Sequence, residues 1–176
     1  MRTVISLLAT LILSISGYAQ SVDREIWENG YYVDEFGEST GIRFISNKEY
    51  LVGTFSNSAT EGSRLNVLLI INAPTLSYIQ LFEYGGTNPV KAFRKTDYDI
   101  YIQDNKGERH QIEGYNLSSD RIVLTVSNAQ TLHNILLKGG TVKFYVSEYG
   151  TQNKYRFQIN NADGYALAYE KYLQLN

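Results

Sequence analysis

Alternation of apolar and polar residues with a period of two is the feature that most restricts the fold of this sequence. Between Asp97 and Gln103 the even positions are apolar or aromatic and the odd ones are mostly polar, which predicts a half-buried β-strand. Three later segments repeat the pattern, with inward residues predicted at Ile122, Leu124, Val126, at Val142, Phe144, Val146 and at Tyr155, Phe157, Ile159. The segment from Asn66 to Ala73 instead contains an uninterrupted apolar run, Val67–Ile71, which predicts a strand that is buried on both faces.

Weaker strand patterns and two helical segments fill most of the remaining chain. The weaker strands are predicted at Trp27–Val33, Ile42–Phe55, Leu76–Tyr84, Val90–Arg94 and Glu108–Tyr115. One helix is predicted to start at Ser127 or Asn128 and to end at Gly139, and a second to run from Tyr165 to Leu173. About nine or ten short strands with turn residues between them indicate an all-β fold. We therefore predict an antiparallel, jelly-roll-like β-sandwich with two short helices, one between late strands and one at the C-terminus.

The N-terminal residues have the pattern of a signal peptide. Arg2 precedes an apolar run from Val4 to Ile15, and Ala19 offers a small residue at a cleavage site, so residues 1–19 are predicted to be removed. The run is about a dozen residues long, whereas a membrane-spanning helix needs about twenty, and a membrane anchor is the less favoured alternative. We predict an exported protein, periplasmic or extracellular, with no stable membrane insertion after cleavage and with residues 20–176 as a single β-sandwich domain. Cysteine is absent, so this fold has to be stable without disulfides.

Two segments carry a resemblance to known proteins: Val33 to Gly41, with the sequence VDEFGESTG, and Gly53 to Leu65, which contains GTFSNSAT and SRL. They resemble an uncharacterised family of exported β-sandwich proteins from gut bacteria. This resemblance implies export but assigns no activity. The order of a helix that ends at Gly139, two strands, and a helix that opens at Gly164 is similar to the invasion-associated locus B family of exported β-sandwiches, whose cysteines are absent here. That similarity implies an envelope or host-facing binding role without catalysis.

Residues that carry catalysis are scarce in this sequence. There is no cysteine nucleophile, and the two histidines, His110 and His133, lie too far apart in the chain for a metal-ligand motif. Asp97 and Asp99 share one strand face at a separation of roughly 7 Å, which falls in the range of an inverting glycosidase pair. No apolar surroundings are evident that would raise a carboxyl pKa, so a solvated strand face is the favoured interpretation. We predict no catalytic residue, no metal, no cofactor and no enzymatic activity, with a glycan hydrolase that uses these carboxylates as the alternative.

Two polar loops allow either a ligand site or a turn. Asp34, Glu35 and Glu38 crowd one loop, where oxygen ligands could hold Ca²⁺, but the spacing is not that of an EF-hand and a charged turn is favoured. A second loop is rich in hydroxyl and amide groups, which suit turn chemistry and also suit adaptable polar contacts. The candidate contact residues in this second loop are Ser56, Asn57 and Ser58.

Fifteen tyrosines are the unusual feature of the composition. Tyr101 and Tyr145 fall on the outward phase of strongly predicted strands, where an aromatic face with a polar tip suits contact with protein or carbohydrate. Cross-strand pairing on the outside of a sheet is the alternative interpretation. A formal net charge of −2 argues against a nucleic-acid partner. We predict a non-catalytic binding module of unknown ligand that contacts protein or glycan surfaces at the bacterial envelope, with a structural or inhibitor protein as a further alternative.

Overall fold

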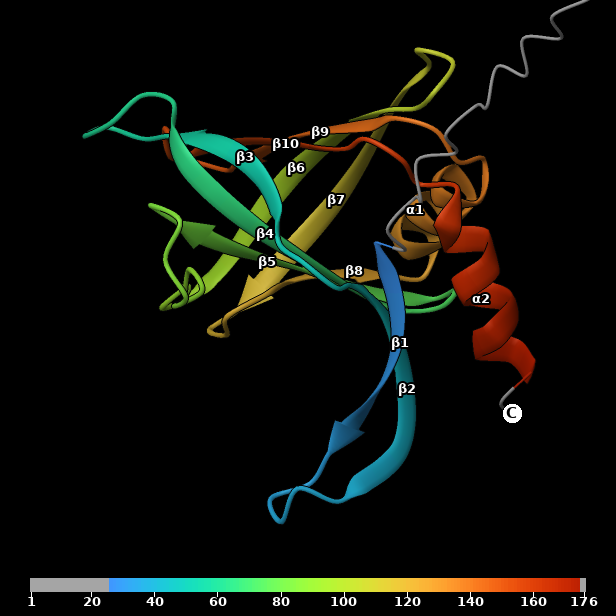
Figure 1. The fold of residues 1–176 in the computed structure, drawn as a ribbon. Coiled ribbons are helices and arrows are strands. Elements are labelled where there is room, and N and C mark those ends of the chain that lie inside the picture. The colour runs from blue at the N-terminus through green and yellow to red at the C-terminus, as the bar shows by residue number, and fades with distance from the viewer. Residues whose placement is uncertain (1–25, 175–176) are drawn as a thin grey trace, which may run out of the picture.

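The computed structural model describes residues 26–174, which contain ten β-strands and two α-helices (Figure 1). In chain order these are β1 (Trp27–Val33), β2 (Ser39–Asn47), β3 (Leu51–Ser56), β4 (Ser63–Asn72), β5 (Leu76–Glu83), β6 (Lys95–Gln103), β7 (Arg109–Leu117), β8 (Ile122–Thr125), α1 (Ser127–Leu137), β9 (Val142–Glu148), β10 (Lys154–Ile159) and α2 (Gly164–Gln174). The predicted signal peptide lies outside the described residues. No helix between residues 26 and 174 combines the length and the apolar character that crossing a membrane requires.

Eight of the described strands close into an antiparallel barrel. Neighbours around the barrel follow the order β4, β3, β10, β9, β6, β7, β8, β5, and pairing of β5 with β4 closes the ring. This closing ladder runs from Leu65 opposite Glu83 to Asn72 opposite Leu76. The predicted jelly-roll-like β-sandwich is therefore wrong, because a closed ring of strand pairs does not divide into two sheets with open edges. Alternation places the same residues inward in a sandwich and in a barrel, so the pattern alone does not separate the two folds.

Most predicted elements lie where the sequence pattern placed them. β1 has the predicted bounds, α1 and α2 follow β8 and β10, and the segment Ile42–Phe55 is divided between β2 and β3. The strand predicted at Val90–Arg94 is wrong, because this segment is a connection between β5 and β6. Its backbone makes isolated hydrogen bonds, from the Val90 amide to the carbonyl of Leu81 and from the Ala92 amide to the carbonyl of Ser119. The inward position predicted for Val126 is also wrong, since this residue is exposed and turns the chain from β8 into α1 with a φ of 44°.

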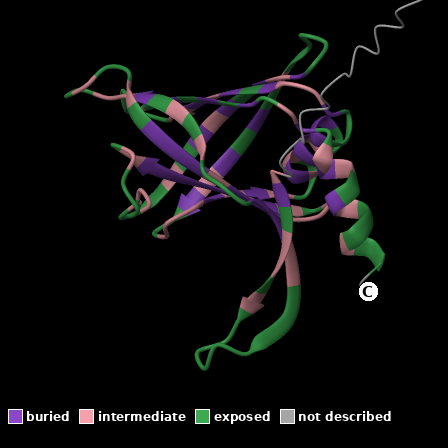
Figure 2. Ribbon diagram, viewed as in Figure 1, coloured by how far each residue is buried: buried purple, intermediate pink, exposed green. Residues whose placement is uncertain are grey.

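Side chains fill the interior of the barrel. Figure 2 shows buried segments along the barrel strands and mostly exposed residues in the hairpin of β1 and β2. Phe144 and Phe157 stack inside on neighbouring strands, with ring centroids 4.6 Å apart. β4 is buried on both faces, as predicted, since Leu69 on the inward face is fully buried and Ile70 on the outward face is 8% exposed. The largest fully covered side chains are Tyr155, Tyr165, Phe55, Ile45, Leu65, Leu69, Ile71, Ile79, Ile100, Ile102, Leu124 and Leu132.

Two hairpins use the same five-residue turn, Asp-x-x-Gly-Glu. In the β6–β7 turn, Asp104 Oδ1 accepts hydrogen bonds from the amides of Lys106 and Glu108, and Gly107 takes the left-handed conformation that its sequence position predicts. In the β1–β2 turn, Asp34 Oδ1 accepts from the amides two and four residues later in the same way. The first carboxylate of each motif thus satisfies the amides of its own turn, which agrees with the charged-turn interpretation of the first loop.

The hairpin of β1 and β2, residues Trp27–Asn47, projects from the barrel and is called the arm below (Figure 1). β2 pairs with β4 at Ile45 and Ser46, and within residues 26–174 the only strand paired with β1 is β2. Helix α2 packs on the base of the arm, where Asn29 Nδ2 donates to the carbonyl oxygen of Ala168 at 3.0 Å. The distal half of the arm extends beyond both the barrel and α2.

Candidate functional site

Tyr101 and Tyr145 lie side by side on the outside of the barrel. They are directly opposite each other in the β6–β9 ladder, and their ring centroids are 5.9 Å apart. Arg156, which pairs with Tyr145 in the β9–β10 ladder, places its guanidinium 5.1 Å from the centroid of that ring. Tyr101 is 42% exposed and Tyr145 is half-buried. The outward phase predicted for both tyrosines therefore agrees with the structure, and cross-strand pairing brings them together with a cation.

Two adjoining hollows lie on this side of the barrel, and the tyrosine pair lines the first of them. The first, of about 430 Å³, is lined by Tyr101, Ile102, Gln103, Arg109, Lys143, Phe144, Tyr145 and Arg156. The second, also of about 430 Å³, is lined by Val52, Gly53, Thr54, Lys143, Phe144, Arg156, Phe157 and Gln158. The two hollows share Lys143 and Arg156, so they form one continuous surface across β6, β9, β10 and β3. We call this surface the tyrosine face and define it by its aromatic and basic members, Tyr101, Tyr145, Arg109, Lys143 and Arg156.

The tyrosine face carries positive charge only. Three of its residues are cations, and none of the described residues that line the two hollows is acidic. Arg109, Lys143 and Arg156 are all exposed, so their charges reach solvent. A guanidinium can bind a carboxylate or a sulfate through two parallel hydrogen bonds, and a tyrosine ring offers a flat apolar surface beside it. This arrangement suits a partner that presents negative charge next to an apolar or sugar surface.

An acidic hollow lies on the same sheet, towards the other end of β6. It has a volume of about 580 Å³, and its carboxylates come from Asp97, Asp99 and Glu113. Asp97 is paired with Lys95 at 3.3 Å, and both side chains are about 60% exposed. The two aspartates predicted to share a face therefore do so, in solvated surroundings that resemble an ordinary charged strand face.

The predicted polar contact loop lies between β3 and β4, outside both hollows. Asn57 Oδ1 accepts hydrogen bonds from the amides of Ala59 and Thr60, at 2.9 and 3.0 Å. Ser56 Oγ accepts from the amide of Gly62 at 3.1 Å, while Ser58 is exposed at the surface. Ser56 and Asn57 thus hold the loop in shape, which agrees with turn chemistry, one of the two roles that the sequence allows for this loop. Of the five predicted contact residues, only Tyr101 and Tyr145 line either of the two hollows.

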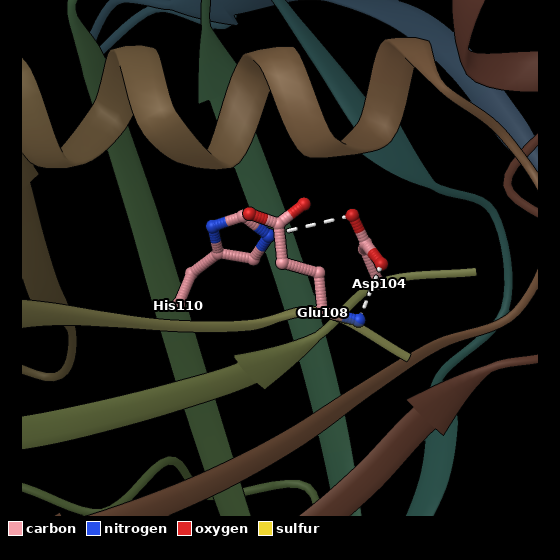
Figure 3. Close-up of side chains that lie close together, drawn as sticks. All are labelled: Asp104, Glu108 and His110. Carbon is pink, nitrogen blue, oxygen red and sulfur yellow. Dashed lines mark hydrogen bonds and ion pairs between the residues drawn. The ribbon is translucent and has the colours of Figure 1, made fainter. Parts of the chain in front are cut away.

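Asp104, Glu108 and His110 form a further cluster at the β6–β7 hairpin, with ligand atoms within 4.8 Å of one another (Figure 3). Both oxygens of the buried Asp104 are engaged, because Oδ1 accepts from the turn amides and Oδ2 lies 3.2 Å from Lys138 Nζ and 3.4 Å from His110 Nε2. Burial raises the pKa of Asp104, but hydrogen bonds from Lys138, the turn amides and His110 outweigh it and hold the pKa at about 2. The Lys138 ammonium already stands where a cation would bind, so this cluster fastens the hairpin to the end of α1.

Two buried titratable groups have structural partners. Tyr155 donates to Glu83 Oε1 at 3.0 Å, and burial raises the pKa of Glu83 despite this hydrogen bond. A raised carboxyl pKa suits a general acid, but Glu83 lines neither the acidic hollow nor the tyrosine face. His133 lies on α1 and packs against α2, where its Nδ1 is 2.7 Å from the Tyr165 hydroxyl, and burial lowers its pKa. Its neutral ring is part of the helix packing.

The basic residues of the tyrosine face are the functional candidates that the sequence analysis missed. Alternation places Lys143 and Arg156 outward, but no local pattern shows that β9 lies between β6 and β10. Comparison with models of protein families, with curated proteins and with solved structures found no match to this chain. The resemblances to an exported family of gut bacteria and to the locus B family therefore stay predictions.

Proposed function

We propose that this protein is an exported, non-catalytic binding module and that the tyrosine face is its contact surface. The observation that carries the proposal is the pair of adjoining hollows: a tilted tyrosine pair lines the first, three exposed cations line the two together, and none of the described lining residues is a carboxylate. The partner is an acidic surface, either of a protein or of a glycan that bears uronate or sulfate groups.

Exposed aromatic rings and arginines are the residue types that dominate binding energy at contact surfaces. A pocketed enzyme site would instead place titratable groups in apolar enclosure, and the tyrosine face is open and shallow. Localisation in the periplasm or outside the cell follows from the predicted signal peptide and belongs to the same proposal.

Titration with polygalacturonate, an acidic glycan, and with an acidic peptide tests the proposal. Lys143→Glu combined with Arg156→Glu reverses two charges of the tyrosine face and should weaken binding at least tenfold, with a steep dependence on salt. Lys91→Glu combined with Arg94→Glu makes the same change in net charge at exposed positions that do not line either hollow. If both variants bind as the wild type does, the tyrosine face is not the contact surface.

A glycan hydrolase is the second candidate, and the acidic hollow with Asp97, Asp99 and Glu113 is the observation that favours it. If this candidate is correct, Asp99→Asn abolishes a turnover that the wild type shows on a glycan, while Lys143→Glu leaves the chemical step unchanged. A wild type that binds the glycan and releases no reducing ends over days would leave the binding proposal in place.

A further inference from the structure

The distal half of the arm presents apolar side chains to solvent. Phe36 is 83% exposed at the tip, and Val33 and Ile42, on the two strands that lead to the tip, are 63% and 59% exposed. All three residues are large and apolar, and their exposure leaves apolar surface on the distal arm that a partner can cover. None of the residues from 26 to 174 covers them.

The tip of the arm, Asp34–Glu38, is also strongly acidic. It carries three carboxylates within five residues, Asp34, Glu35 and Glu38, and all three residues are exposed. Asp34 uses Oδ1 to hold the turn, so the exposed carboxylates of Glu35 and Glu38 are the ones that can bind a partner without loss of the turn. The tip therefore combines an exposed aromatic ring with negative charge.

The tip and the tyrosine face complement each other in charge and in chemistry. One is acidic with an exposed phenylalanine, and the other is basic with a tyrosine pair of which Tyr101 is exposed and Tyr145 half-buried. Figure 1 places the arm on one side of the barrel and β9 and β10 on the other, so the arm of one molecule does not reach its own tyrosine face. The arm tip can therefore meet a tyrosine face only on another molecule.

We propose that the arm tip of one copy docks on the tyrosine face of the next copy. Glu35 and Glu38 then lie against Lys143 and Arg156, and Phe36 packs beside the tyrosine pair. The inference rests on the proposed function, since it names a second copy of this chain as the acidic partner of the same face. Because the two surfaces differ, the contact is head-to-tail, and it generates rings or open filaments rather than a two-fold dimer.

Sedimentation velocity of the purified protein over a concentration series tests this docking. A hairpin tip buries less than the roughly 800 Å² per partner of a standard interface, so the series extends to high micromolar concentration. We expect the wild type to show species larger than a dimer. Glu35→Lys with Glu38→Lys, and separately Lys143→Glu with Arg156→Glu, should each abolish association. Glu49→Lys with Glu170→Lys, which changes net charge equally at exposed positions away from the tip, should not.

Mixing the two reversed proteins gives the decisive result. The tip-reversed protein has a basic tip and a basic face, and the face-reversed protein has an acidic tip and an acidic face, so an equimolar mixture should associate again. Association that persists in either reversed protein alone, or a mixture that stays monomeric, overturns the head-to-tail contact.

The proposed function and this inference fail in different ways. A wild type that stays monomeric but binds polygalacturonate through the tyrosine face refutes the inference and leaves the proposed function standing. A wild type that neither associates nor binds any acidic probe refutes both.

Discussion

Replacing Asn47 by Ala tests how the arm is joined to the barrel at β4, which pairs with β2 of the arm and with β3 and β5 of the barrel. Asn47 is the last residue of β2. Just before it, Ile45 and Ser46 pair with β4, and just after it, pairing of β3 with β4 begins at Leu51. Its buried side chain replaces missing ladder bonds, because Oδ1 accepts from the amide of Leu69 at 2.6 Å and Nδ2 donates to the carbonyl of Val67 at 3.2 Å. Nδ2 also donates to the carbonyl of Glu49 at 2.7 Å.

The expected loss of stability follows from these three hydrogen bonds. In the variant the Leu69 amide is left buried without a partner, which costs about 1–3 kcal/mol. Each of the two hydrogen bonds that Asn47 Nδ2 donates contributes about 0.5–1.5 kcal/mol more. The free energy of unfolding should therefore fall by about 2–6 kcal/mol, a large part of the 5–15 kcal/mol typical of a domain. Asn88→Ala, at an exposed position, is the control and should change stability by less than about 0.5 kcal/mol.

Urea unfolding followed by circular dichroism measures the difference between the two variants. If Asn47→Ala loses less than about 1 kcal/mol, the side chain does not replace the ladder bonds and the reasoning is wrong. A change in the slope of the transition would indicate instead that the arm unfolds separately from the barrel.

Three further predictions concern the core and the response to pH. Leu69→Ala and Phe144→Ala should each cost about 2–5 kcal/mol in urea unfolding, because both side chains are buried inside the barrel. Burial lowers the pKa of His133, so its contribution to the free energy of unfolding should be fully present above the ordinary histidine pKa of 6.5 and should be lost as pH falls below it. His133→Gln should remove this loss of stability between neutral and mildly acidic pH. The pKa of Asp104 is about 2 against an ordinary 3.8, so its stabilisation should be lost as pH falls between these values, and Asp104→Asn should flatten the acid transition.

The strands and helices were predictable because each has a local signal. Alternation over Asp97–Gln103 identifies β6 within two residues, and the Gly at position 139 ends the first helix close to the predicted residue. Closure of the barrel has no such signal. It depends on pairing between segments far apart in the chain, such as Tyr155 opposite Phe55 and Tyr78 opposite Val123, and the alternation is the same whether or not these pairs form.

The candidate site was predictable in part for the same reason. The outward phase of Tyr101 and Tyr145 follows from alternation, but their contact follows from the β6–β9 ladder, which joins strands separated by two other strands and a helix. Ser56 and Asn57 were ambiguous because a residue that satisfies its own loop has the same composition as one that contacts a ligand. Only the hydrogen bonds of the folded loop separate the two interpretations.

If the tyrosine pair is a contact surface rather than a stabilising pair, the double variant Tyr101→Ala with Tyr145→Ala should lose affinity and keep most of its stability, and one titration with a melting curve measures both. We expect the affinity of this double variant for polygalacturonate to fall by at least about tenfold, since truncation of an aromatic anchor often costs more than about 2 kcal/mol. A cross-strand pair contributes about 0.2–1 kcal/mol, so the Tm of the same sample should fall by no more than about 4 °C. A variant that melts many degrees lower and binds as tightly as the wild type would contradict the account.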